Sequence, residues 1–366
     1  MSAESFSMEQ LFRPEALNFP KYTLNEPSAL TRLHQNEILL LDESDRLELA
    51  DELRRRIKFS EAFNTYPSLE PAELLNAFAQ SLNVMPENIE VTAGSSQALT
   101  LIAEALFGPQ RKIAITAPSF SLYAHLAALY GSSVVGISLG ENFEYSPAAL
   151  FSQEVLDAQV AILCTPNNPT GTALSFETIT EFARVFRGVV VVDEAYFEFF
   201  AAQNGQSCVQ WAAGRKNVIV LRTLSKAWAA AGLRVGAMVG HKDVISLFRA
   251  LKAPYSIAWP SEVLAAYILT RKQSVTQERV SQTVRQVAEL EACLRTCGGI
   301  DVLASSKANF VFFRTGRAAE LENTLGASGF LVRRYSSGRL ENCVRISMPP
   351  ADRFDLLKTE LRKVLS

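Results

Sequence analysis

The sequence predicts an α/β fold in which a mainly parallel, seven-stranded sheet is flanked by helices and followed by a smaller α+β domain. From residue 89 onward, short apolar runs bounded by turn residues alternate with segments of helical length. These runs are rich in Val and Ile and lack strict polar alternation, which is typical of strands buried on both faces. Regular alternation of strands and helices indicates parallel βαβ units. The runs are IEVTAG, KIAITAP, SSVVGISL, VAILCTP, VVVVDEA, VIVLRTL and VGAMVG.

The chain before the first strand divides into an arm and two helices. In residues 1–35, Pro14, Pro20 and Pro27 interrupt any long helix, so we predict an irregular N-terminal arm. Residues 45–58 place apolar side chains at helical spacing between charges, and AELLNAFAQSLNV repeats this pattern further on. Both segments are predicted to be helices.

The chain after the last sheet strand has a different pattern. From residue 261 one long helical stretch runs to the cysteine pair near residue 297, and strand-like ANFVFFR, GFLVRRY and NCVRISM follow it. A final helix, ADRFDLLKTELRKVL, completes the chain. We therefore predict an arm at 1–35, a large domain at 36–260 and a small domain at 261–366.

Composition excludes several classes of protein. The 366 residues include 36 Lys+Arg and 38 Asp+Glu, a formal net charge of −2 that gives no electrostatic footprint for nucleic acid or an anionic membrane. No apolar run is long enough to span a bilayer, and the first residues lack the pattern of a secretory signal. The five cysteines are an odd number scattered along the chain, which favours a reducing compartment, so we expect a cytoplasmic protein. Three histidines far apart in sequence offer no metal site.

Polar side chains follow the apolar runs at the carboxyl ends of the predicted strands, where open α/β sheets bind ligands. A Gly-Ser-Ser turn opens the helix after the first run, and a similar turn before a helix can bind an anion or only cap the helix. Asp193 ends VVVVD, and Tyr196 lies three residues on. The residues after the other runs are Ser119, Phe120 and Ser121, then Asn168 in TPNNPTG, then Ser225, Lys226 and Arg234.

The ordered combination of these motifs resembles the fold-type I pyridoxal-phosphate (PLP) aminotransferases, and within them the histidinol-phosphate aminotransferase branch. The resemblance runs from about Leu33 to the C-terminus. It rests on TPNNPTG, VVDEAYFEF, TLSKAWAAAGLRVG, LKAPYSIAWPS, SKANFVFF and GFLVRRY…NCVRIS. It implies PLP as the cofactor, a ping-pong transamination with glutamate and 2-oxoglutarate as the second pair, and a homodimer.

The resemblance also implies roles around the cofactor ring. Lys226 matches the lysine that forms a Schiff base with the aldehyde and then moves a proton between the substrate Cα and the cofactor. Asp193 matches the carboxylate that faces the pyridine nitrogen and keeps the ring protonated. Asn168 and Tyr196 match the partners of the ring O3′. Phe120 matches the aromatic residue that stacks on the ring, where the branch commonly has tyrosine.

The resemblance also implies which residues bind the cofactor phosphate and which residue comes from the neighbouring subunit. Gly94, Ser95 and Ser96 open the helix whose backbone N–H groups would meet the phosphate, with Ser225 and Arg234 beside them. Tyr66 matches a tyrosine that reaches the cofactor phosphate of the neighbouring subunit, which implies an active site shared across a two-fold interface.

Substrate selection depends on two arginines. Arg345 matches the family arginine that holds the anionic end of the substrate. In LVRRY a strand aims successive side chains at opposite faces, and the alignment with the family points to Arg333 as the second anion-binding arginine. Tyr22 loosely matches the arm tyrosine that touches the substrate phosphate, and Asn36 begins the segment that lies near the substrate.

Departures from the branch pattern leave the substrate open. Asn36-Glu37 is followed by Ile-Leu-Leu in place of the usual Asn-Pro or Tyr-Pro step, and Gly-Ser-Ser replaces the more usual Gly-Ser-Asp/Glu. The leading prediction is histidinol-phosphate:2-oxoglutarate transamination. The alternatives are an aromatic or broad-range aminotransferase, a lyase similar to threonine-phosphate decarboxylases, and a non-catalytic protein on the same scaffold.

Overall fold

The computed structural model describes residues 14–17, 31–38, 43–57 and 63–365. Its largest sheet has seven strands in the order β2-β8-β7-β6-β5-β3-β4. Strand β8 runs in the opposite direction to the other six. The mainly parallel sheet of seven strands is therefore confirmed, and each of the apolar runs forms one strand. The strands are β2 (Ile89–Thr92), β3 (Lys112–Ala117), β4 (Ser133–Ser138), β5 (Val160–Cys164), β6 (Val189–Asp193), β7 (Val218–Thr223) and β8 (Gly236–Gly240).

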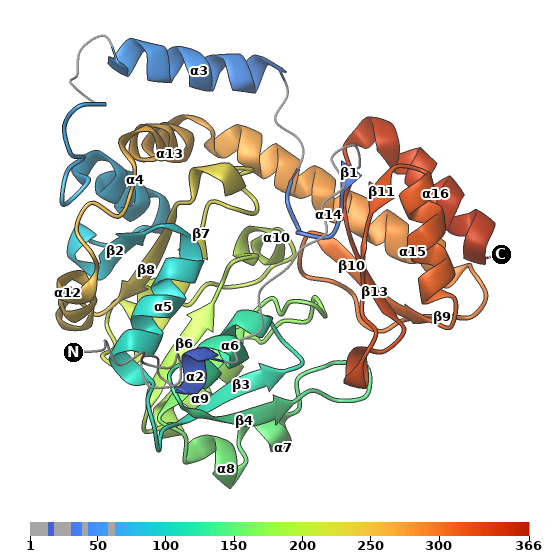
Figure 1. The fold of residues 1–366 in the computed structure, drawn as a ribbon, viewed down its shortest axis with the longest axis horizontal. Helices are drawn as coiled ribbons and strands as arrows, with labels where there is room; N and C mark the ends of the chain where they lie inside the picture. Colours follow the sequence, from blue (N-terminus) through green and yellow to red (C-terminus); the bar gives the residue numbers. More distant parts are fainter. Residues whose placement is uncertain (1–13, 18–30, 39–42, 58–62, 366) are drawn as a thin grey trace, which may run out of the picture.

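Helices cover both faces of this sheet (Figure 1). One face packs against α4 (Ala72–Leu82), α9 (Phe176–Val185), α11 (Val209–Ala212) and α13 (Trp259–Arg271). The other face packs against α5 (Gly94–Leu106), α6 (Ser121–Leu129) and α12 (Lys242–Leu251). The chain from β4 to β5 contains the short helices α7 (Pro147–Leu150) and α8 (Gln153–Leu156). The chain from β6 to β7 contains the short helix α10 (Phe197–Ala201).

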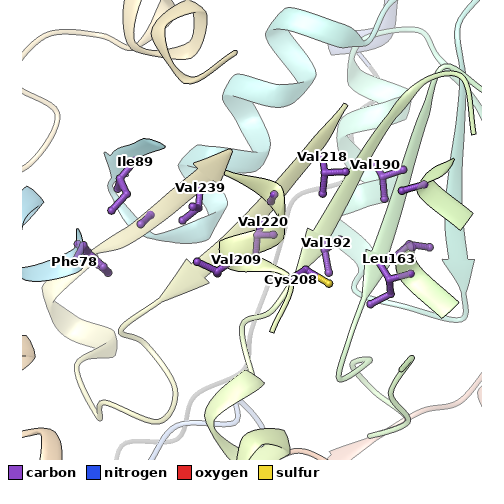
Figure 2. Close-up of a cluster of buried hydrophobic side chains, with 14 of the residues drawn as sticks. Phe78, Ile89, Leu163, Val190, Val192, Cys208, Val209, Val218, Val220 and Val239 are labelled. Carbon is purple, nitrogen blue, oxygen red and sulfur yellow. The ribbon is translucent and has the colours of Figure 1, made fainter. Parts of the chain in front are cut away.

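Alternating side chains of each strand fill two separate cores, which explains the absence of polar alternation in the sequence. Val190 and Val192 of β6 lie in the core drawn in Figure 2, whereas Val191 between them lies in the core on the opposite face. The same alternation holds along β7. In the central strands β5 and β6 the residues are apolar until Asp193 ends β6, and this places the candidate site at one edge of the sheet.

The C-terminal part forms a second, four-stranded sheet in the order β12-β13-β10-β9. Helix α14 (Gln273–Arg295) runs from the large sheet to this small one, where it packs with α15 (Ala318–Ala327) and α16 (Ala351–Leu365) (Figure 1). The strands are β9 (Ile300–Val302), β10 (Phe310–Thr315), β12 (Arg333–Arg334) and β13 (Cys343–Ser347). No helix in the described ranges has the length and apolarity that a bilayer crossing requires.

Three sequence expectations for the C-terminal part differ from the structure. The single helical stretch after residue 261 is two helices, because the chain turns at Lys272 between α13 and α14. GFLVRRY is not one strand: β11 (Phe330–Leu331) pairs with β1, and β12 then pairs with β13. Strand β9 was not predicted, because its three residues carry too short a pattern.

The N-terminal segment is more ordered at its end than the predicted irregular arm. Helix α2 (Pro14–Leu17) is described, and β1 (Thr31–Arg32) pairs in parallel with β11, which leaves Leu33 fully buried in the small core. Helix α3 (Glu43–Ile57) matches the predicted helix at 45–58. The division of the chain at residue 260 stays a prediction, and the packing of α13 against α4 favours a boundary later in the chain.

Candidate active site

The carboxyl ends of β5, β6 and β7 meet at one edge of the large sheet because these neighbouring strands are parallel and in register. Cys164 at the end of β5 lies opposite Asp193 at the end of β6, and Asp193 lies opposite Leu221 of β7. The loops that follow therefore bring Asn168, Asp193 and Lys226 to the same edge, as the sequence predicted.

Asp193 is a buried carboxylate held by two donors. It is only 3% exposed; its Oδ1 accepts the backbone N–H of Ala195 at 3.0 Å and its Oδ2 accepts the hydroxyl of Tyr123 at 2.7 Å. Burial raises the pKa of Asp193, while these two hydrogen bonds and the charge of Lys226 act in the opposite direction. Such a carboxylate has a fixed orientation and can pair with a cation brought into the site.

Lys226 is a lysine with a lowered proton affinity. Its ammonium donates to the backbone carbonyl of Gln35 at 2.8 Å and lies 5.6 Å from the ring centroid of Tyr196. Burial first, and then the positive charges of Arg345 and Arg234, lower the pKa of Lys226 to about 8, although nearby carboxylates oppose this. Near neutral pH a much larger fraction of Lys226 is therefore a free amine than of an ordinary exposed lysine, as a nucleophile requires.

The loop that carries Lys226 is anchored by a buried ion cluster behind the sheet edge. Arg222 donates to Glu194 at 3.0 Å and to Glu198 at 2.7 Å, and Glu198 also accepts the indole N–H of Trp228 at 3.1 Å. Glu194 directly follows Asp193, and Trp228 lies two residues after Lys226. The cluster therefore ties the ends of β6 and β7 to the Lys226 loop that follows β7. Sequence reasoning did not identify it.

The start of α5 and the guanidinium of Arg234 form an anion cradle. Arg234 Nη1 donates to Ser225 Oγ at 3.2 Å, and a Cβ on Gly94 would lie 2.5 Å from Arg234 Nη2. A side chain here would displace this end of Arg234, and the φ of +75° at Gly94 is one that side chains rarely adopt. Ser95 and Ser96 follow in the first turn of this 13-residue helix, where backbone N–H groups favour an anion. The donors suit a phosphate dianion.

A second part of the site centres on Arg345, a buried residue of β13 whose guanidinium donates to two acceptors. Its guanidinium donates to the side-chain oxygen of Asn168 and to the backbone carbonyl of His34, and its centre lies 5.4 Å from the ring of Phe310. The Nε–H of Arg345 is buried and has no hydrogen-bond partner. An unsatisfied charged donor in this position can bind an anionic substrate group.

Tyr196 and Asn36 are direct partners in this region. Asn36 Nδ2 donates to the Tyr196 hydroxyl at 2.9 Å, and Asn36 Oδ1 accepts from Ser347 at 3.0 Å. Burial raises the pKa of Tyr196, although the charge of Arg345 opposes this. Asn36 therefore orients the Tyr196 hydroxyl in the structure, a contact that the sequence did not predict.

Arg333 and Arg334 point to opposite faces of their sheet. Arg333 pairs in register with Arg345 on the antiparallel neighbour β13, so the two side chains lie on the same face. Arg334 instead donates to Glu322 at 2.6 Å. Arg333 is exposed, and its guanidinium lies 5.5 Å from the ring of Tyr335. The alternation expected from LVRRY is therefore observed.

The remaining candidates differ in position. Phe120 precedes α6 and packs edge-on against Tyr123, with ring centroids 5.6 Å apart. Tyr66 is 80% exposed and stacks on Tyr255, with centroids 4.6 Å apart, so it lies on the surface. Tyr22 lies outside the described residues. Tyr123 is the site residue that sequence reasoning missed; its position one helical turn after Phe120 was the available signal.

Comparison with known proteins gives the family. The model for aminotransferase class I and II matches residues 29–357. The chain belongs to this family. The aminotransferase is 32% identical, over 98% of its length and 100% of the relative, to a histidinol-phosphate aminotransferase of Caldanaerobacter subterraneus. It is 35% identical to the histidinol-phosphate aminotransferase of Colwellia psychrerythraea, over 82% of this chain and 84% of that one.

Solved structures give the same fold. A histidinol-phosphate aminotransferase from Sinorhizobium meliloti in complex with pyridoxal-5′-phosphate has a TM-score of 0.86 at 22% identity, covering 100% of this chain and 99% of that one. An L-threonine-O-3-phosphate decarboxylase from Porphyromonas gingivalis has a TM-score of 0.77 at 24% identity, covering 91% and 99%. The predicted fold type I and PLP-dependent transamination are confirmed.

Uptake of PLP by the cofactor-free aminotransferase is expected to follow the protonation of Lys226. The pKa of Lys226 is lowered to about 8, and only the neutral amine attacks an aldehyde. The rate of uptake should therefore rise with pH up to about 8 and level off above it. Stopped-flow absorbance of the apo-protein mixed with PLP at pH 6–10 measures this. A rate that continues to rise towards pH 10 would indicate an ordinary exposed lysine.

Proposed function

We propose that this aminotransferase transfers the amino group of histidinol phosphate to 2-oxoglutarate in a ping-pong reaction, which converts 2-oxoglutarate to glutamate. The observation that carries this proposal is the pairing of Arg333 with Arg345 on one face of the small sheet. One guanidinium suffices for the α-carboxylate of an amino acid, whereas two suit a phosphate monoester. The full-length relatives that are histidinol-phosphate aminotransferases support the same substrate.

PLP supplies an aldehyde for the substrate amine and a ring that accepts electrons when the substrate Cα loses its proton. Lys226 is proposed to hold the cofactor at rest and then, as a free amine, to take the Cα proton and return it. Asp193 would hold the proton on the ring nitrogen, and Asn168 and Tyr196 would hold the ring oxygen. Their contacts at the strand ends support these assignments.

The cofactor phosphate would lie in the anion cradle formed by Gly94, Ser95, Ser96, Ser225 and Arg234, and its ring would stack on Phe120. The close approach of Arg234 to Gly94 supports this placement, because a side chain there would fill the cradle. In this arrangement the backbone N–H groups and the guanidinium fix the cofactor while the chemistry proceeds at the strand ends.

The protein is further proposed to act as a cytoplasmic homodimer, with Tyr66 reaching the cofactor phosphate of the second subunit. Three exposed aromatic side chains gather near this position. Phe63 is 71% exposed, Tyr66 is 80% exposed, and Tyr255 is 41% exposed and stacked on Tyr66. Apolar rings exposed to this extent are usually covered by a partner. In that dimer Tyr66 has a hydrogen-bonding role that the monomer does not give it.

Single-turnover reactions test the substrate. Histidinol phosphate should bleach the visible band of the PLP-loaded protein rapidly. Bleaching by phenylalanine or tyrosine, with no response to histidinol phosphate, would assign an aromatic or broad-range aminotransferase. Release of CO2 from O-phosphothreonine would assign a lyase.

The pair Arg333→Gln and Arg334→Gln tests the phosphate assignment. Arg333→Gln should lower kcat/KM for histidinol phosphate by about 10- to 100-fold, the effect of one hydrogen bond to a charged group, and leave the glutamate half-reaction nearly unchanged. Arg334→Gln is the matched control, because Arg334 faces away and pairs with Glu322. Equal effects of both variants on histidinol phosphate would contradict the proposal.

A further inference from the structure

Tyr123 donates a hydrogen bond to Asp193, the buried carboxylate of the candidate site. Its side chain is fully buried, and its hydroxyl donates to Asp193 Oδ2 at 2.7 Å. Tyr123 lies in the first turn of α6, and Phe120, at the start of the same helix, packs edge-on against it at 5.6 Å between centroids. One short segment therefore touches both the proposed ring-stacking residue and the proposed ring-nitrogen acid.

We infer that Tyr123 is a positioning residue, whose hydroxyl keeps Asp193 ionised and aimed at the ring nitrogen of PLP. This inference rests on the proposed pairing of Asp193 with that nitrogen. With Ala195 N–H on Oδ1 and Tyr123 O–H on Oδ2, each carboxylate oxygen has one protein donor and keeps lone pairs for the cofactor.

The electrostatic surroundings explain why such a donor matters. Asp193 is buried, and burial favours its neutral form. The titratable groups that act on it include Tyr123 of α6, the thiol of Cys164 at the end of β5, the phenol of Tyr196 and the ammonium of Lys226. Lys226 acts on Asp193 through its charge alone, so Tyr123 O–H and Ala195 N–H are the hydrogen-bond donors that hold this carboxylate.

Tyr123 can act only as a donor here. Burial and the neighbouring charge of Asp193 raise the pKa of Tyr123 well above its ordinary value, so the phenol keeps its proton throughout the physiological range. A donor that never titrates holds the carboxylate in one state, and the ring nitrogen then keeps its proton during the reaction.

The substitution Tyr123→Phe tests this inference, with Tyr145→Phe as the matched control. The Tyr145 hydroxyl donates to the backbone carbonyl of Cys164 at 2.6 Å, so the control removes a hydroxyl from the same region without touching Asp193. Visible absorption of the PLP-loaded proteins, titrated with pH, is the readout. Without the Tyr123 hydroxyl, Asp193 competes better for the ring proton, so the lysine–cofactor linkage should titrate about one pH unit higher.

Two further measurements separate positioning from folding and from the proposed function. Dissociation of PLP should be about ten-fold faster in Tyr123→Phe, and far-UV circular dichroism and the thermal unfolding midpoint should show an unchanged fold. Asp193→Ala should shift the titration at least as far. If Asp193→Ala shifts the titration and Tyr123→Phe behaves like Tyr145→Phe, the role of Tyr123 is refuted. If Asp193→Ala causes no shift, the pairing of Asp193 with the cofactor fails as well.

Discussion

Replacing Lys226 with alanine is expected to lower transamination by at least about 10³-fold, since the variant loses its general acid–base group. The ammonium of Lys226 lies at the sheet edge beside Tyr196, and its charge acts on Asp193. The effect should fall on kcat and not on KM, because proton transfer at the substrate Cα is lost while the phosphate-binding and anion-binding arginines remain. Single-turnover absorbance with histidinol phosphate measures it.

Two controls sharpen this prediction. Lys216→Ala removes an exposed lysine that pairs with Asp243 on the surface, and it should leave the rate unchanged. Added primary amines, such as methylamine or ethylamine, should restore part of the lost rate in Lys226→Ala, because a small amine can occupy the vacated space. A Lys226→Ala protein that transaminates at the native rate would exclude Lys226 as the proton carrier.

Replacing Arg345 with glutamine is expected to lower kcat/KM by about 10²- to 10⁴-fold in both half-reactions, the combined effect of two hydrogen bonds to a charged group. Arg345 is 6% exposed, and its guanidinium also holds Asn168 and the carbonyl of His34. Most of the loss should appear in KM, because in the proposed reaction both the phosphate of one donor and the carboxylate of the other bind this group. Steady-state kinetics with each substrate pair measures the effect.

The contrast between Arg345 and its neighbours makes this prediction specific. Arg333→Gln should affect the phosphate-bearing donor only, and Arg314→Gln, on strand β10 of the same sheet, should affect neither donor, because its guanidinium lies over the ring of Phe143. A loss confined to histidinol phosphate in Arg345→Gln would show that the carboxylate substrates bind elsewhere.

The large sheet could be predicted because its strands carry an unambiguous signal. Val190, Val191 and Val192 are all apolar because both faces of β6 are covered, and turn residues limit each run. The sequence pattern predicted the elements of the small sheet less well. The chain turns at Lys272 within a continuous helical pattern, and GFLVRRY divides between two sheets because β1, distant in sequence, pairs with its first half. Local periodicity cannot report such long-range pairing.

Some residues of the candidate site could likewise be predicted from the sequence, and others could not. Asp193, Asn168 and Lys226 follow strands, and the topology of a parallel sheet brings such residues together. Tyr123 lies inside a helix, and the contact of Asn36 with Tyr196 joins residues 160 positions apart. The spacing from Phe120 places Tyr123 on the side of its helix near the site, but neither hydrogen bond follows from spacing alone, because each depends on how a helix or a loop packs against the strand ends.

Borohydride reduction of the PLP-loaded protein, followed by peptide mapping with mass spectrometry, tests most directly whether Lys226 carries the cofactor. The reduced protein should bear one pyridoxyl group on the peptide that contains Ser225 and Lys226, and Lys226→Ala should bear none. A pyridoxyl group on any other lysine, or an unlabelled native protein, would contradict the account.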